Sequence, residues 1–219
     1  MDIYEVTVRF FQNGGPFMYP IALVLTIGLA IALERWVVLS TSRVRNRMAF
    51  NKAMEHLQQQ DYSTLIETGN TSKVPMYRIV AAGLGRFIGS HRRDDIESAM
   101  EEGVMEALPG LEKRTQYLAT LANVATLLGL LGTIVGLIAA FSAVADAAPT
   151  EKASMLSSSI SVAMNTTAFG LISAIPLLLL HAVLQTKTTE IVDSFEMASV
   201  KVLNVLAGDQ ARVRQAHTA

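Results

Sequence analysis

The stretch that decides the fold is "LLGLLGTIVGLIAAF", residues 127–141. It is apolar enough for a membrane span, yet three glycines and Thr133 stand where leucine would suit a simple anchor better. An α-helix turns by about 100° per residue, so residues spaced alternately three and four apart share a face. The small residues and threonine on the face of Thr133 are Ala122, Thr126, Gly129, Gly136 and Ala140, and Gly132 forms a GxxxG pair with Gly136. Small residues let helix backbones approach closely, so we expect this face to receive a helix of another protein.

Three segments are long enough to cross a bilayer, which takes roughly 20 apolar residues. They are residues 17–39, 117–145 and 153–181. Only 17% of the 219 residues are charged, against about 25% in a typical soluble domain. No alternation typical of strands stands out. The sequence therefore predicts an all-α membrane protein with three transmembrane helices, whose long helices extend into a cytoplasmic helical domain.

Lysine and arginine concentrate between the first and second spans. That region holds eleven of them, from Arg43 to Arg114, whereas only Arg9 precedes the first span and only Lys152 separates the second from the third. Segments rich in Lys and Arg stay on the cytoplasmic side. We therefore predict a periplasmic N-terminal segment (1–16), a cytoplasmic helical domain (40–116), a periplasmic loop (146–152), and a cytoplasmic C-terminal helix and tail (182–219).

Helix signals subdivide the cytoplasmic domain. A helix is predicted to begin at Asp94 or Asp95, because acidic residues in the first turn suit the helix dipole. Pro109 and Gly110 predict either a break or the start of a new helix. From Leu111 onward, the pattern predicts one helix that continues into the second span.

The third span is unusually polar for a membrane segment. Its hydroxyl and amide residues are Ser154, Ser157, Ser158, Ser159, Ser161, Asn165, Thr166, Thr167 and Ser173. A single hydroxyl can bond a carbonyl one turn earlier in its own helix. Polar groups in such number usually face a bundle interior or a water-filled path instead. Thr133, Asn165, Thr166 and Thr167 are therefore the candidates for an ion pathway, and Gly170, close to Thr167, joins the helix-packing residues.

The residues that are absent narrow the function further. No Asp, Glu, Lys or Arg lies within the second or third span, although a proton path normally needs a titratable group near the midplane. A carboxylate would have to come from another subunit. The chain has no cysteine and its four histidines are scattered, so we expect no enzyme, metal site or cofactor. A net charge of −1 argues against nucleic acid as a partner.

Two stretches together resemble the MotA/TolQ/ExbB proton channel family. They are "LEKRTQYLATLANVATLLGLLGTIVGLIAAF" and "SISVAMNTTAFGLISAIP". Three spans are similar to the TolQ/ExbB branch, and the two pore threonines of the family fall on Thr133 and Thr167. One position differs, because the best-known ExbB and TolQ proteins carry a glutamate five residues before the second threonine, where this chain has Val162.

The resemblance implies a multi-pass protein of the bacterial inner membrane. It also implies a homopentamer around the helices of an ExbD/TolR-like single-span subunit with an intramembrane Asp, and a TonB/TolA-like protein that receives the work. We therefore expect an ion-channel-forming stator subunit that couples proton, or sodium, motive force to mechanical work. The alternative is a non-conducting scaffold that assembles and holds a single-span partner. Basic residues near the first span are expected to touch membrane lipid.

Overall fold

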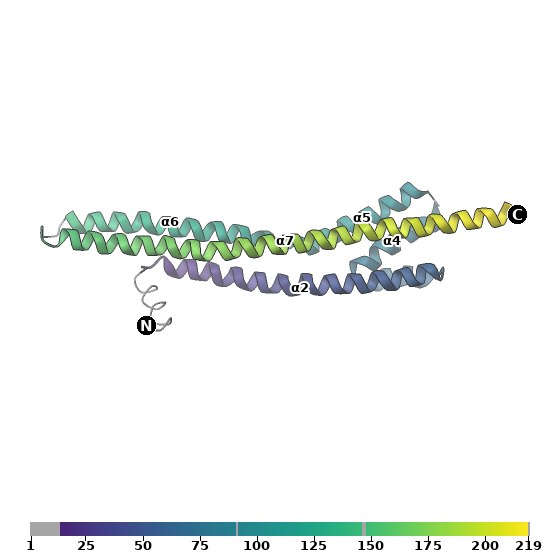
Figure 1. Ribbon diagram of the computed structural model, residues 1–219, viewed down its shortest axis with the longest axis horizontal. Helices are drawn as coiled ribbons and strands as arrows, with labels where there is room; N and C mark the ends of the chain where they lie inside the picture. Colours follow the sequence, from purple (N-terminus) through teal and green to yellow (C-terminus); the bar gives the residue numbers. More distant parts are fainter. Residues whose placement is uncertain (1–13, 91, 146–147, 219) are drawn as a thin grey trace. The chain divides into compact units, whose positions relative to one another are not determined.

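The computed structural model describes residues 14–90, 92–145 and 148–218, the last ten of these by their backbone. All regular structure within these ranges is α-helical (Figure 1). The helices are α2 (Met18–Gln58), α3 (Tyr62–Thr71), α4 (Pro75–Gly89), α5 (Arg93–Glu112), α6 (Thr115–Ala145) and α7 (Lys152–Thr218). Three helical stretches, in α2, α6 and α7, are long and apolar enough to cross a membrane, which confirms the predicted all-α, three-span fold class.

The contacts divide the chain into two units. The membrane unit combines the residues up to Arg35 with Arg114–Leu184, and the extramembrane unit combines Trp36–Lys113 with the residues from Gln185 onward. We name them for their composition, because most of each predicted span lies in the first and most charged side chains lie in the second. The long helices α2 and α7 each contribute to both units.

In the membrane unit, α2 begins after a turn at Gly14 and Gly15. Gly15 has a φ of +72°, in the left-handed region that glycine adopts without a steric penalty. The Met18 N–H donates to the Gly15 carbonyl at 3.3 Å as the helix begins. Further along, a Cβ added to Gly28 would lie 2.6 Å from Cδ2 of Leu177. The absence of a side chain at Gly28 therefore lets α2 pack directly against α7.

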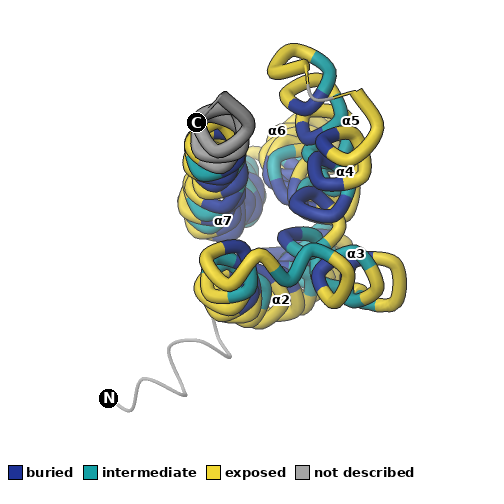
Figure 2. Tube along the Cα trace, turned by 90° about the vertical axis from the view of Figure 1, so that its right-hand side faces the viewer, coloured by how far each residue is buried: buried dark blue, intermediate teal, exposed yellow. Residues whose placement is uncertain are grey.

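Helix α4 forms the centre of the α3–α4–α5 part of the extramembrane unit. Its buried side includes Ile79, Val80, Leu84 and Phe87. Gly83 lies against Met100 of α5, and Gly103 of α5 lies against Ile79. Figure 2 shows these buried faces in dark blue on α4 and α5, with exposed residues on their outer sides. Burial of this apolar face, rather than intrinsic helix propensity, holds the short helices together.

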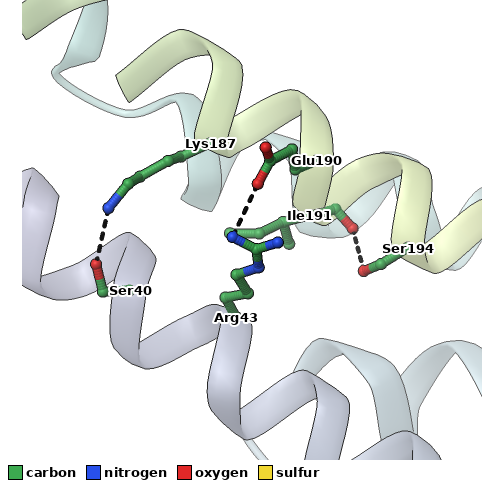
Figure 3. Close-up of polar contacts among 6 residues, drawn as sticks. All are labelled: Ser40, Arg43, Lys187, Glu190, Ile191 and Ser194. Carbon is green, nitrogen blue, oxygen red and sulfur yellow. Dashed lines mark hydrogen bonds and ion pairs between the residues drawn. The ribbon is translucent and has the colours of Figure 1, made fainter. Parts of the chain in front are cut away.

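Polar contacts join α2 to α7 within the extramembrane unit (Figure 3). Lys187 Nζ donates to Ser40 Oγ at 3.2 Å and lies 3.3 Å from the centroid of the Trp36 ring. About one turn further along, Arg43 Nη1 lies 2.9 Å from Glu190 Oε2. Residue numbers rise together in the two contacts, so α2 and α7 run parallel here with residue 40 level with residue 187.

Two expectations for α5 differ from the structure. The helix begins at Arg93, one residue before the earlier predicted start, and Asp94 and Asp95 occupy its first turn. It does not break at Pro109, which lies inside the helix. Proline removes one backbone donor. Pro109 is followed by only three more helical residues, so the missing hydrogen bond affects only the final turn of α5.

The expectation of one helix from Leu111 into the second span is wrong. α5 ends at Glu112, α6 begins at Thr115, and Arg114 between them has a φ of +65°. A non-glycine residue in this region costs free energy, so the break needs compensation from its surroundings. Arg114 Nη1 lies 2.7 Å from each carboxylate oxygen of Glu34, so the side chain at this break pairs with α2.

Candidate ion pathway at the α6–α7 interface

The two candidate pore threonines meet at one backbone carbonyl. The hydroxyl of Thr167 on α7 donates to the Gly129 carbonyl on α6 at 2.9 Å. In a regular α-helix the same carbonyl also accepts the N–H four residues later, which belongs to Thr133. Thr167 therefore reaches this point through its hydroxyl and Thr133 through its backbone, although 34 residues separate them in the sequence.

The missing side chains of two glycines make this hydrogen bond geometrically feasible. A Cβ on Gly170 would lie 2.8 Å from the Ala125 carbonyl oxygen and 3.0 Å from Gly129 Cα. A Cβ on Gly129 would lie 3.3 Å from Gly170 Cα. The helix backbones thus touch at this crossing, as small residues allow in membrane bundles.

The Thr133 hydroxyl is engaged within its own helix. It donates to the Leu130 carbonyl at 2.6 Å, and the residue is half-buried. The Thr126 hydroxyl on the same face behaves in the same way, donating to the Ala122 carbonyl at 3.1 Å. The hydrogens of these hydroxyls point to carbonyls, and their oxygen lone pairs stay available as acceptors.

Thr166 differs from its neighbour Thr167, because its side chain is buried. Its Oγ1 lies 2.7 Å from the Gly14 carbonyl and 3.0 Å from the Val162 carbonyl, so the hydroxyl ties α7 to the segment before α2. Beside it lies a pocket of about 250 Å³ to which Val162 and Gly132 contribute, with no charged residue in its lining. Asn165 is half-buried, and the structure records no hydrogen bond of its amide with a described residue.

The remaining predicted packing residues lie along α6. Ala122, Gly129, Gly132 and Ala140 are buried, Gly136 is half-buried, and Thr126 is exposed. A Cβ on Gly136 would lie 3.0 Å from Cβ of Ala163 on α7, and Gly132 lies against Thr166. At these glycines the space is therefore occupied by α7 of the same chain. Docking of another protein's helix stays a prediction, and it now concerns the accessible part of the face around Thr126 and Thr133.

A charged cluster at one end of the membrane unit was not singled out from the sequence as a site. Arg35 is only 3% exposed, beside the Glu34–Arg114 pair. The signal was present, because an arginine near the end of a long apolar run must either bury or snorkel its guanidinium. In the part of the chain that the structure describes, no three His, Asp or Glu side chains gather as they would around a metal ion.

Three apolar helices, with hydroxyls at the crossing of α6 and α7, define the class, a multi-pass α-helical membrane protein suited to transport or channel function. Comparison with known proteins identifies the family within this class. Residues 71–197 match the model of the MotA/TolQ/ExbB proton channel family, and this chain belongs to that family. The resemblance found in the sequence is thereby confirmed. The protein is a multi-pass inner-membrane subunit of the proton-channel, energy-transducing kind.

Two relatives carry related names. A biopolymer transport protein ExbB homologue of Methanothermobacter thermautotrophicus is 27% identical over 199 residues, covering 90% of this chain and 69% of the relative. The biopolymer transport protein ExbB-like 3 of Synechocystis sp. is 28% identical over 167 residues, covering 76% of this chain and 79% of the relative. Both names point to the ExbB part of the family.

Proposed function

We propose that this chain is the channel-forming stator subunit of a membrane motor that couples proton or sodium motive force to mechanical work at the cell envelope. It acts in a TonB- or Tol-type system, as a homopentamer around an ExbD/TolR-like single-span subunit. A TonB/TolA-like protein receives the work. The observation that carries the proposal is the α6–α7 crossing. There the Thr167 hydroxyl donates to the Gly129 carbonyl, which also accepts the Thr133 N–H in a regular helix.

The hydrogen bonds at this crossing specify what the threonines offer to an ion. Both hydroxyl hydrogens are directed to backbone carbonyls, that of Thr133 to Leu130 and that of Thr167 to Gly129. The oxygens therefore act as acceptors toward a third group. They suit a protonated carboxyl group, a water molecule or a sodium ion, each of which seeks an oxygen acceptor or ligand.

A partner has to supply the titratable group. Helix α6 has no acidic residue, and the first acidic residue of α7 is Glu190, in the extramembrane unit. Val162 stands in the neutral pocket beside Thr166. A single-span subunit whose aspartate approaches Thr133 and Thr167 would complete the path, and the threonine oxygens would favour that aspartate in its protonated form.

The test is Thr133→Val and Thr167→Val in the complex with its single-span partner, reconstituted in vesicles. Valine keeps the shape of threonine and removes the oxygen. We expect proton or sodium flux, measured in buffers with and without sodium, to be lost in both variants. Thr26→Val is the matched control, because this α2 hydroxyl makes the same kind of bond, to the Ala22 carbonyl at 2.8 Å, outside the proposed path. Unchanged flux in both pore variants would refute their assignment.

A scaffold without conduction is the second candidate. Its supporting observation is that Gly129, Gly132 and Gly170 are all used in packing within the chain, which a static holder also needs. The wild-type complex separates the two functions. Vesicles that contain it and show no flux above empty vesicles, while the partner remains bound, would establish the scaffold.

We further propose that the N-terminus and the loop before α7 face the periplasm and that the C-terminus lies in the cytoplasm. The chain has no cysteine, so single introduced thiols report their location directly. A membrane-impermeant thiol reagent added to intact cells should label Ala148→Cys, in the exposed loop, and spare Gln58→Cys at the end of α2. The opposite labelling would reverse the topology.

A further inference from the structure

The extramembrane unit has an apolar groove with acidic walls. The groove, of about 550 Å³, lies between α5 and α7. We call it the acidic groove, and its lining consists of Glu97, Glu101, Val104, Met105, Leu108, Val192, Glu196, Ser199, Val200 and Leu203. Met105 is 70% exposed and Val200 51% exposed. Large apolar side chains exposed together in a polar setting mark an interaction surface.

A second surface of the same unit has the opposite charge. Val44 and Met48 lie one turn apart on α2 and are 57% and 54% exposed. By helical position, three exposed cations flank this apolar pair, Arg45, Arg47 and Lys52, and one acid, Glu55, follows further along. We call this face the α2 ridge. It offers the acidic groove both an apolar centre and complementary charge.

The two surfaces also lie at the same level along the long helices. The contacts of Ser40 with Lys187 and of Arg43 with Glu190 share one offset in residue number, so Val44 is level with residue 191 of α7. The ridge, residues 44–55, is then level with residues 191–202, and the α7 wall of the groove extends from Val192 to Leu203.

The ridge and the groove share one level along α2 and α7, and they are different patches of one chain. Such a pairing is heterologous, and repeated rotation closes it into a ring. We propose that the α2 ridge of one copy occupies the acidic groove of the next, and that this contact orders the copies outside the membrane.

This inference rests on the proposed function only in taking several copies to assemble. The test uses the full chain in its native membrane. Val44→Cys places a thiol on the ridge and Val192→Cys places one in the groove, at a matching level along α2 and α7, in a chain without native cysteine. A short thiol cross-linker should join chains carrying both substitutions into a ladder of multimers. Each single variant should stay monomeric in a denaturing gel, because like surfaces do not meet. The pair Ile88→Cys and Val192→Cys is the control, since Ile88 on α4 is 56% exposed and belongs to neither surface.

Charge reversal provides a second test of the contact between the ridge and the groove. Arg47→Glu in the double-cysteine chain should reduce the linked fraction several-fold, and adding Glu196→Arg should restore it, because these two positions then carry opposite charges again. A properly inserted double variant without multimers would overturn the inference. Dimers of a single-cysteine variant would overturn it as well, since they require a symmetric contact, and a groove thiol linked to another protein would assign the groove to that protein. Ion flux measured on the same variants is an independent readout, so loss of the ladder and loss of conduction remain distinguishable.

Discussion

The contacts that hold the helices together within the membrane unit differ from those within the extramembrane unit. In the membrane unit, helices meet where side chains are missing, at Gly129 and Gly170, and hydroxyls bond backbone carbonyls. In the extramembrane unit, α4 buries an apolar face against its neighbours, as at Gly83 and Met100, and exposed ion pairs such as Arg43–Glu190 join α2 to α7. The difference follows from the solvent. Apolar burial gains little in lipid, so close van der Waals contact and hydrogen bonds must hold helices together there.

The comparison also predicts which sites are most sensitive to substitution. Close backbone contact in the membrane unit leaves no room for an added atom, whereas exposed ion pairs contribute little each. We therefore expect the largest effects from steric changes in the first unit, and the smallest from changes of surface charge in the second.

Gly170→Leu should have the largest effect. Even its Cβ would lie 2.8 Å from the Ala125 carbonyl oxygen, so the α6–α7 crossing must open, at a cost of about 3 kcal/mol or more. Thermal denaturation of the protein in lipid nanodiscs, followed by circular dichroism, measures the loss. Gly85→Leu on α4 is the control, because no atom lies within 4 Å of its added Cβ. That variant should gain about 0.5–1 kcal/mol in helix propensity, and equal losses in both would contradict the steric explanation.

Asn46→Ala should have the next largest effect, now in the extramembrane unit. Asn46 is buried, its Oδ1 accepts the Met76 N–H at 3.2 Å, and its Nδ2 donates to Ser42 Oγ at 3.1 Å. The substitution leaves the Met76 N–H in the first turn of α4 without its acceptor, at a cost of about 1–3 kcal/mol. Chemical denaturation checks this. The exposed Asn51→Ala should stay within about 0.5 kcal/mol of wild type.

Thr167→Val should lower stability by about 0.5–1 kcal/mol, near the lower end for a lost hydrogen bond. The Gly129 carbonyl keeps its helical donor, so the substitution strands no buried acceptor. The same nanodisc melts measure this difference. Thr26→Val, whose hydroxyl is exposed, should change stability less. Loss of flux in Thr167→Val with nearly full stability would separate its functional from its structural contribution.

The smallest effect concerns pH and Asp61, the N-cap of α3. Hydrogen bonding to Thr64, first of all, holds the pKa of the Asp61 carboxyl below its usual range. A depressed folded-state pKa means that this stabilisation is present above the unfolded pKa of about 3.9 and is lost as the pH falls through the folded value. Hydrogen-exchange protection of α3, corrected for the intrinsic exchange rate at each pH, should therefore fall in acid. Asp61→Asn should remove this acid-dependent component, and unchanged acid dependence would show that another group is responsible.

Periodicity identified a face of small residues on α6 but could not say which helix packs against it. The spacing of Gly129, Gly132 and Gly136 requires only that some backbone approaches closely. The structure places α7 there, and the glycine of α7 that matches this face, Gly170, lies 41 residues after Gly129. Nothing in a helical wheel distinguishes a neighbour in the same chain from a neighbour in another.

The ends of the helices were harder to predict than their existence. Pro109 suggested a break, yet α5 continues for three more residues and ends at Glu112. The break comes at Arg114, where no glycine or proline announces it, in a backbone conformation that local propensity disfavours, and the side chain of this residue pairs with Glu34. Glu34 lies 80 residues earlier in the sequence. A contact at that separation is invisible to any local pattern.

Arg114 also has a consequence for sequence variation. Its backbone conformation favours glycine, whereas its contact with Glu34 requires a cation. The two demands conflict, so selection at this position acts on a pair of residues. Arg114→Gly should be tolerated best when Glu34 is also replaced by a neutral residue. In a library that randomises both positions, the survivors should divide into two groups, charged pairs and neutral pairs with glycine at the joint.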